Sequence, residues 1–127
     1  DNIIFVSIHH NATNAAVQTS ASGMYTFFRN NSPSTNTNYY KNYNVEKRQR
    51  LASLLLLETN KSTNFSKKQT TPVNADYSVL RENNLVSTLV EVGFMNNPND
   101  LKQIVQDSVR EDVAYGLLKG IIAYFNN

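Results

Sequence analysis

Three titratable residues stand within or next to two strongly apolar segments and are the first candidates for chemistry. His9 and His10 directly follow the apolar run over residues 3–8, and Glu91 lies inside the apolar segment 89–94. A buried glutamate is costly unless it is paired, hydrogen-bonded or used. In open α/β sheets, ligands bind outside the carboxyl ends of the strands. The sequence therefore predicts that a histidine and Glu91 reach the same edge of a sheet.

The same residues also have purely structural explanations. His9 could be a satisfied histidine at the end of a strand, and Glu91 could form a buried ion pair with an arginine such as Arg81. Side chains alternate along a strand, so His10 is expected to point away from His9 and to be structural or loop-facing. Residue types alone leave these alternatives open.

Composition limits the classes of site and partner. The chain has 127 residues and no cysteine, so a metal ion would have to be held by histidines and carboxylates. The net charge of +2 and the scattered basic residues exclude the dense basic stripe of a nucleic-acid binder. No apolar run is long enough to span a bilayer, and no signal peptide is recognisable. We therefore expect neither nucleic-acid binding nor membrane insertion.

Apolar patterning predicts the elements that position the candidate residues. Residues 3–8 and 85–92 are apolar on both faces, which is typical of buried strands. Shorter strands are expected over residues 23–28 and 77–81, and a helix is expected from about residue 39 to residue 59.

Two further helices are expected in the C-terminal part. Asn97 is suited to cap a helix that has Pro98 in its first turn and Asp100 near its positive end. A last helix is expected to start at Asp107 or Ser108.

This order of elements predicts an α/β fold with a mostly parallel central sheet and helices on both faces. The length suits one domain with one modest core, over residues 1–127. Few helical residues precede residue 39, so one face of the first strand would be poorly covered. We therefore expect that sequence upstream of Asp1 is missing.

Two motifs resemble those of zinc-dependent N-acetylmuramoyl-L-alanine amidases. Residues 7–12, SIHHNA, match the family motif S-I-H-x-N-A, and residues 90–98, VEVGFMNNP, match the motif E-x-G-F-x-(S/N)-N. The segment VLR at residues 79–81 resembles the one that precedes the second motif. The resemblance covers nearly the whole chain and implies the C-terminal two-thirds of an amidase catalytic domain.

The resemblance implies roles for four residues. His9 matches the zinc-ligating histidine of the first motif, and Glu91 matches the catalytic glutamate, which acts as general base for a zinc-activated water. Asn11 is expected to orient the site, and Arg81 is expected to contact the peptide stem. The implied reaction is cleavage of the amide between N-acetylmuramic acid and L-alanine in bacterial peptidoglycan. The implied location is outside the cell, at the bacterial wall.

The departures from the family pattern leave a second hypothesis. Family members have a Gly-His-Gly segment and a ligating glutamate near the domain start, and neither has a counterpart here. In addition, Val86 stands where a proline is usual. The alternative is a catalytically incomplete module of the same fold, with a cell-wall-binding or regulatory role. The sequence does not separate an autolysin, a sporulation or division enzyme, and a phage lysin.

Overall fold

The computed structural model describes residues 2–14 and 17–126. Four strands form one sheet in the order β1-β4-β2-β3. Their bounds are Ile4–Asn11 for β1, Met24–Phe28 for β2, Val73–Asn74 for β3 and Val86–Phe94 for β4. The pairs β1/β4 and β2/β3 are parallel, whereas β2 runs antiparallel to β4. The predicted α/β class with a mostly parallel sheet is confirmed.

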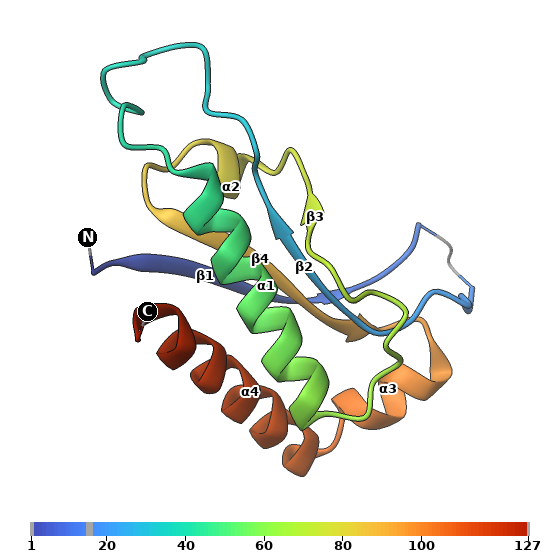
Figure 1. Ribbon diagram of the computed structural model, residues 1–127. Helices are drawn as coiled ribbons and strands as arrows, with labels where there is room; N and C mark the ends of the chain where they lie inside the picture. The colour runs from blue at the N-terminus through green and yellow to red at the C-terminus, as the bar shows by residue number, and fades with distance from the viewer. Residues whose placement is uncertain (1, 15–16, 127) are drawn as a thin grey trace.

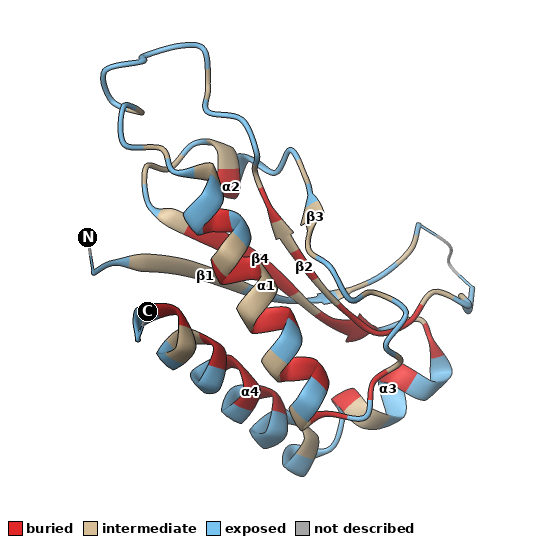
Figure 2. Cartoon of the chain, in the orientation of Figure 1, coloured by how far each residue is buried: buried red, intermediate tan, exposed pale blue. Residues whose placement is uncertain are grey.

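Two long helices cover one face of this sheet. Helix α1 (Val45–Ser62) and helix α4 (Asp107–Phe125) pack side by side, and α1 also contacts β2 and β4. Figure 2 shows the buried positions along β2 and β4 and on the facing sides of the two helices. This layer contains the core, formed by Met24, Leu51, Leu55, Leu56, Phe65, Val90, Val92, Ile104, Val113, Leu117 and Tyr124.

Capping side chains fix where two helices begin. Asn44 accepts a hydrogen bond from the Lys47 amide at 2.8 Å, so α1 begins at Val45, later than the predicted residue 39. Asn97 accepts bonds from the amides of residues 99 and 100 and caps α3 (Pro98–Ile104), as predicted. The predicted start of the last helix at Asp107 is also confirmed.

Residues 77–81 do not form the predicted strand. Ser78–Arg81 is a short helix, α2, in which the Tyr77 carbonyl accepts bonds from the amides of Leu80 and Arg81. The composition of this short segment was compatible with a strand, but contacts from distant residues hold it as a helical turn. The strand next to β2 is instead the two-residue β3, which lies between the predicted helix and the predicted strand, where no element was expected.

The strand β1 is also less buried than predicted. It forms an edge of the sheet, and its residues from Ile8 to His10 are exposed while Ile4 to Ser7 are half-buried.

A buried carboxylate ties together the chain at the end of β4. Asp100, which is 1% exposed, accepts bonds at Oδ2 from the amides of Gly23 and Phe94, both at 2.9 Å. Gly93 has a φ of +68°, and a Cβ there would lie 2.8 Å from the ring of Phe65. The register between β1 and β4 shifts at this point, so Gly93 allows a bulge that ends the strand.

The contact between α1 and α4 depends on glycine. A Cβ at Gly116 would lie 2.7 Å from the Thr59 Cα and 2.9 Å from the Glu58 carbonyl oxygen. We expect Gly116→Ala to lower the free energy of unfolding by about 1–3 kcal/mol through overpacking, although alanine favours helices. Urea unfolding measures this change. The exposed Lys119→Ala is the control, and equal stability of Gly116→Ala and wild type would contradict the prediction.

Candidate active site

The sheet register places His9 directly opposite Glu91. These residues are Cα partners in the parallel β1/β4 pair, and Tyr25 is the partner of Glu91 in the antiparallel β2/β4 pair. Opposite residues on neighbouring strands direct their side chains to the same face. Three strands therefore contribute a row, His9–Glu91–Tyr25, on the face opposite the one that packs against α1.

A pocket of about 430 Å³ lies at this row. From β1 and β4 it is lined by Ser7, His9, Leu89 and Glu91, and its other wall is the start of α2 at residues 77–79. Since Val90 and Val92 belong to the core on the α1 side, Leu89 and Glu91 face the other way. Helix α2 thus covers part of the second face of the sheet.

The two histidines differ in their surroundings. His9 is exposed, and its Nε2 lies 2.7 Å from the Ser7 hydroxyl. The His10 Nδ1 lies 2.8 Å from the Val92 carbonyl oxygen and donates to it in the matching tautomer. His10 therefore ties β1 to β4, as expected for a structural residue, and His9 faces the pocket.

Glu91 is half-buried and lacks a neutralising partner. Its Oε2 is buried and has no hydrogen-bond partner among the described residues. Desolvation by burial raises the pKa of the Glu91 carboxyl, and the nearby His9 and His10 oppose this rise. Glu91 does not form the alternative ion pair with Arg81. Instead, Arg81 pairs with Asp76 at 2.7 Å and with Glu82 at 3.6 Å.

Asn11 and Arg81 lie apart from each other. Asn11 ends β1, where its Oδ1 accepts a bond from the Ala12 amide and its carbonyl accepts one from the Met95 amide. Arg81 lines a different cavity, beside Arg29 and Tyr40. The structure therefore places Asn11 at the strand end next to His9 and directs Arg81 away from the pocket.

Sequence reasoning missed Tyr25 and the pocket wall on α2. Tyr25 was inside a predicted strand, but its pairing with β4 has no local signal. Reasoning from the sequence also missed how the loops at this edge are joined: Asn96 accepts a bond from the Thr13 amide at 3.2 Å and donates to the Thr13 hydroxyl at 2.7 Å.

The described residues do not form a complete metal site by themselves. Within residues 2–14 and 17–126, no group of three or more His, Cys, Asp or Glu side chains could hold a metal ion. The His9 imidazole and the Glu91 carboxyl group belong to residues that line the same pocket, and both are ligand types that zinc accepts.

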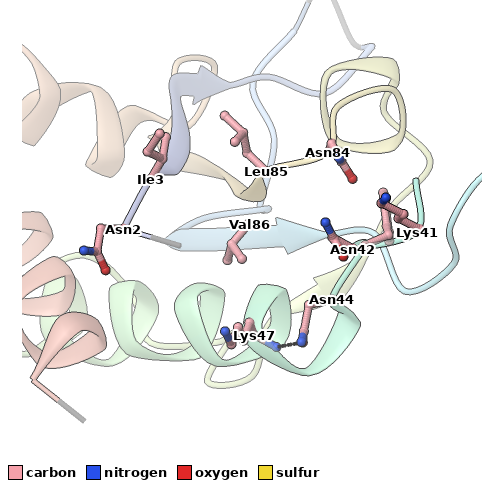
Figure 3. A pocket seen from close by; sticks show the side chains of 10 residues that line it. Asn2, Ile3, Lys41, Asn42, Asn44, Lys47, Asn84, Leu85 and Val86 are labelled. Carbon is pink, nitrogen blue, oxygen red and sulfur yellow. Dashed lines mark hydrogen bonds between the residues drawn. The ribbon is translucent and has the colours of Figure 1, made fainter. Parts of the chain in front are cut away.

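A second cavity, of about 640 Å³, lies where β4 begins and lacks these features. Figure 3 shows it lined by asparagine and lysine side chains, among them Asn44, Lys47 and Asn84. It contains neither a histidine nor a carboxylate, so it offers no general base.

Comparison with known proteins decides the family. A family model described as N-acetylmuramoyl-L-alanine amidase matches residues 1–123. The chain belongs to this amidase family. A probable amidase, AmiB, from Haemophilus influenzae is 34% identical over 56 residues, which are 44% of this chain and 13% of that protein.

Solved amidases share the fold. An N-acetylmuramoyl-L-alanine amidase from Clostridium difficile 630 superposes with a TM-score of 0.78 at 24% identity, over 98% of this chain and 58% of that one. The CwlD amidase of Clostridioides difficile, solved in complex with the GerS lipoprotein, gives 0.75 at 25% identity, over 97% and 54%. This amidase-family chain therefore spans little more than half the length of these two structures. None of the helices in the described ranges combines the length and apolar character needed to cross a membrane.

The raised pKa of Glu91 predicts a pH-dependent stability in the metal-free protein. The folded protein binds the Glu91 proton more tightly than the unfolded chain does, so this stabilisation is present below the ordinary carboxyl pKa and is lost as the pH rises through the folded pKa. As the pH rises through the folded pKa of Glu91, we expect the free energy of unfolding of wild type to fall relative to that of Glu91→Gln. Urea unfolding with a chelator, from about pH 4 to about pH 8, measures it.

The exposed Glu111→Gln is the control for this titration and should follow wild type. Parallel pH curves for wild type and Glu91→Gln would contradict the prediction.

Proposed function

We propose that the complete protein hydrolyses the amide between N-acetylmuramic acid and the L-alanine of the peptidoglycan stem. The observation that carries this proposal is the register of Glu91 opposite His9 at an open pocket, in a chain that matches the amidase family almost throughout. A carboxylate beside an imidazole in a cleft is one arrangement that can catalyse amide hydrolysis by water.

Glu91 is the proposed general base. The Glu91 side chain lines the pocket, and its carboxylate can accept a proton from a water that attacks there. The raised pKa brings the carboxyl closer to the operating pH, where a group can both take up and release a proton. Glu91 then passes the proton to the leaving amine of the stem peptide.

His9 is the proposed zinc ligand of this chain. When bound, a zinc ion supplies a Lewis acid that polarises the scissile carbonyl and lowers the pKa of water. The Ser7 hydroxyl at 2.7 Å from Nε2 orients the imidazole, as partners of metal-binding histidines do. A catalytic zinc site has three protein ligands, so His9 would be joined by ligands from outside the described residues.

The surroundings suit a large, polar substrate. The pocket is bounded by exposed side chains, including His9, Tyr77 and Val79, so a polymer can approach it. The small positive net charge suits weak attraction to an anionic wall. We propose that the protein acts outside the cell, at the bacterial wall. Asn11 is proposed to steady the strand end beside His9. Arg81 is proposed to contact the stem peptide outside the pocket, from the separate cavity that it lines.

Loss of the base should abolish turnover. We expect Glu91→Gln in the complete protein to lower kcat on purified peptidoglycan by at least about 100-fold, because the amide cannot take the proton from water. Zinc content should stay the same. Release of stem peptides from the glycan measures the rate, with Glu111→Gln as control. Near-normal activity of Glu91→Gln would refute the role of Glu91, and an inactive wild type would favour a wall-binding or regulatory module.

The paired histidines provide a matched test of the metal ligand. We expect His9→Ala to weaken zinc binding by at least about tenfold, and His10→Ala to keep the wild-type affinity because His10 is engaged with the Val92 carbonyl. Metal content after dialysis and competition with a zinc chelator measure both. Unchanged zinc affinity in His9→Ala would remove His9 from the ligand set.

A further inference from the structure

Arg48 is the largest fully buried side chain in the described part of the chain. No ion pair among the described residues includes it. A buried guanidinium without a carboxylate is costly unless hydrogen bonds compensate for the lost water. The hydrogen-bond partners of the Arg48 guanidinium therefore show which part of the chain it holds in place.

The partners of Arg48 are two backbone carbonyls and one hydroxyl around α2 and the start of β4. Nη1 donates to the Leu80 carbonyl at 2.6 Å and to the Ser87 hydroxyl at 2.9 Å, and Nη2 donates to the Asn83 carbonyl at 2.7 Å. The guanidinium lies over the Tyr43 ring, 3.6 Å from its centroid, and the Tyr43 hydroxyl donates to the same Leu80 carbonyl. We call these contacts the Arg48 clamp.

Helix α2 depends on contacts of this kind. It has only four residues, and its N-cap residue Tyr77 makes no side-chain capping bond. A single helical turn is not stable alone in water. The clamp joins the Leu80 carbonyl of α2 to α1, and the side-chain amide of Asn83 donates to the Val79 carbonyl and to the Ser87 hydroxyl.

Helix α2 also forms one wall of the pocket at Glu91. Residues 77–79 line that pocket opposite His9 and Glu91, whereas Arg48 does not line it. An apolar side chain of similar size could occupy the same core space, but it would leave the three acceptors without the donors of Arg48 and could not hold them in a fixed arrangement. The guanidinium of Arg48 therefore contributes more to the arrangement of the chain around α2 than to filling the core.

We propose that Arg48 is a positioning residue for hydrolysis: it fixes α2 against β4 and so sets the shape of the pocket beside Glu91. This inference rests on the proposed function, since it assigns residues 77–79 to substrate contact. Because Arg48 acts through α2 and not through the base, its loss should weaken substrate binding more than the chemical step.

Arg50 supplies a matched control on the same helix. Its guanidinium donates to the carbonyls of Tyr124 at 3.0 Å and Ala123 at 3.2 Å, at the end of α4 and away from the pocket. Arg48→Met and Arg50→Met in the complete protein both exchange bonds to backbone carbonyls for an unbranched apolar side chain. Only the first loosens α2.

The experiment compares kcat, KM and hydrogen exchange for these variants. We expect Arg48→Met to raise KM for soluble peptidoglycan fragments about tenfold with kcat within about twofold, and Arg50→Met to leave both unchanged. The amides of Leu80, Arg81 and Glu82 should exchange faster only in Arg48→Met. If Arg48→Met does not fold, Tyr43→Phe removes one bond to Leu80 and should shift KM in the same direction by less.

The outcomes separate the two proposals. An active wild type with unchanged KM in Arg48→Met, or with equal changes in both arginine variants, would overturn the positioning role and leave the proposed function intact. A wild type without activity toward peptidoglycan would overturn the proposed function itself, and the exchange rates would still show whether Arg48 holds α2.

Discussion

The parallel register between β1 and β4 is the constraint on which the candidate site depends. It sets His9 opposite Glu91, and a slip of one residue would turn Glu91 toward the apolar layer under α1. The apolar residues beside Glu91 prevent this slip, since Val90 and Val92 are buried in that layer. The bulge at Gly93 and the bonds of Asp100 then end β4 at Phe94, three residues after Glu91.

The two faces of the sheet consequently serve different purposes. One face carries the core, closed by α1 and α4 with glycine contacts between the helices. The other carries the row His9–Glu91–Tyr25, where a half-buried carboxylate is left without a hydrogen-bond partner for one oxygen. Such a group destabilises the folded state, and the packed face opposite it supplies the stability that allows it. The Arg48 clamp joins α1, on the first face, to α2, which forms a wall of the pocket on the second face.

Sequence patterns predicted those features that local physics determines. Apolar periodicity identified the four longer elements β1, β4, α1 and α4, and the cap at Asn97 fixed the start of α3. The helical turn at α2 was missed because its carbonyls are held by Arg48 and Tyr43, more than 30 residues earlier, and no local pattern encodes that. His9 and Glu91 lie in local motifs and could be identified from the sequence. Tyr25 could be identified only from the order of the strands in the sheet, which places it opposite Glu91.

The most direct test of the account is anomalous scattering at the zinc absorption edge, measured on crystals of the complete protein. The account predicts a peak about 2.0–2.1 Å from a ring nitrogen of His9, on the side that faces Glu91. A zinc peak that lies elsewhere, with His9 unligated, would contradict the claim that His9 and Glu91 form one catalytic centre.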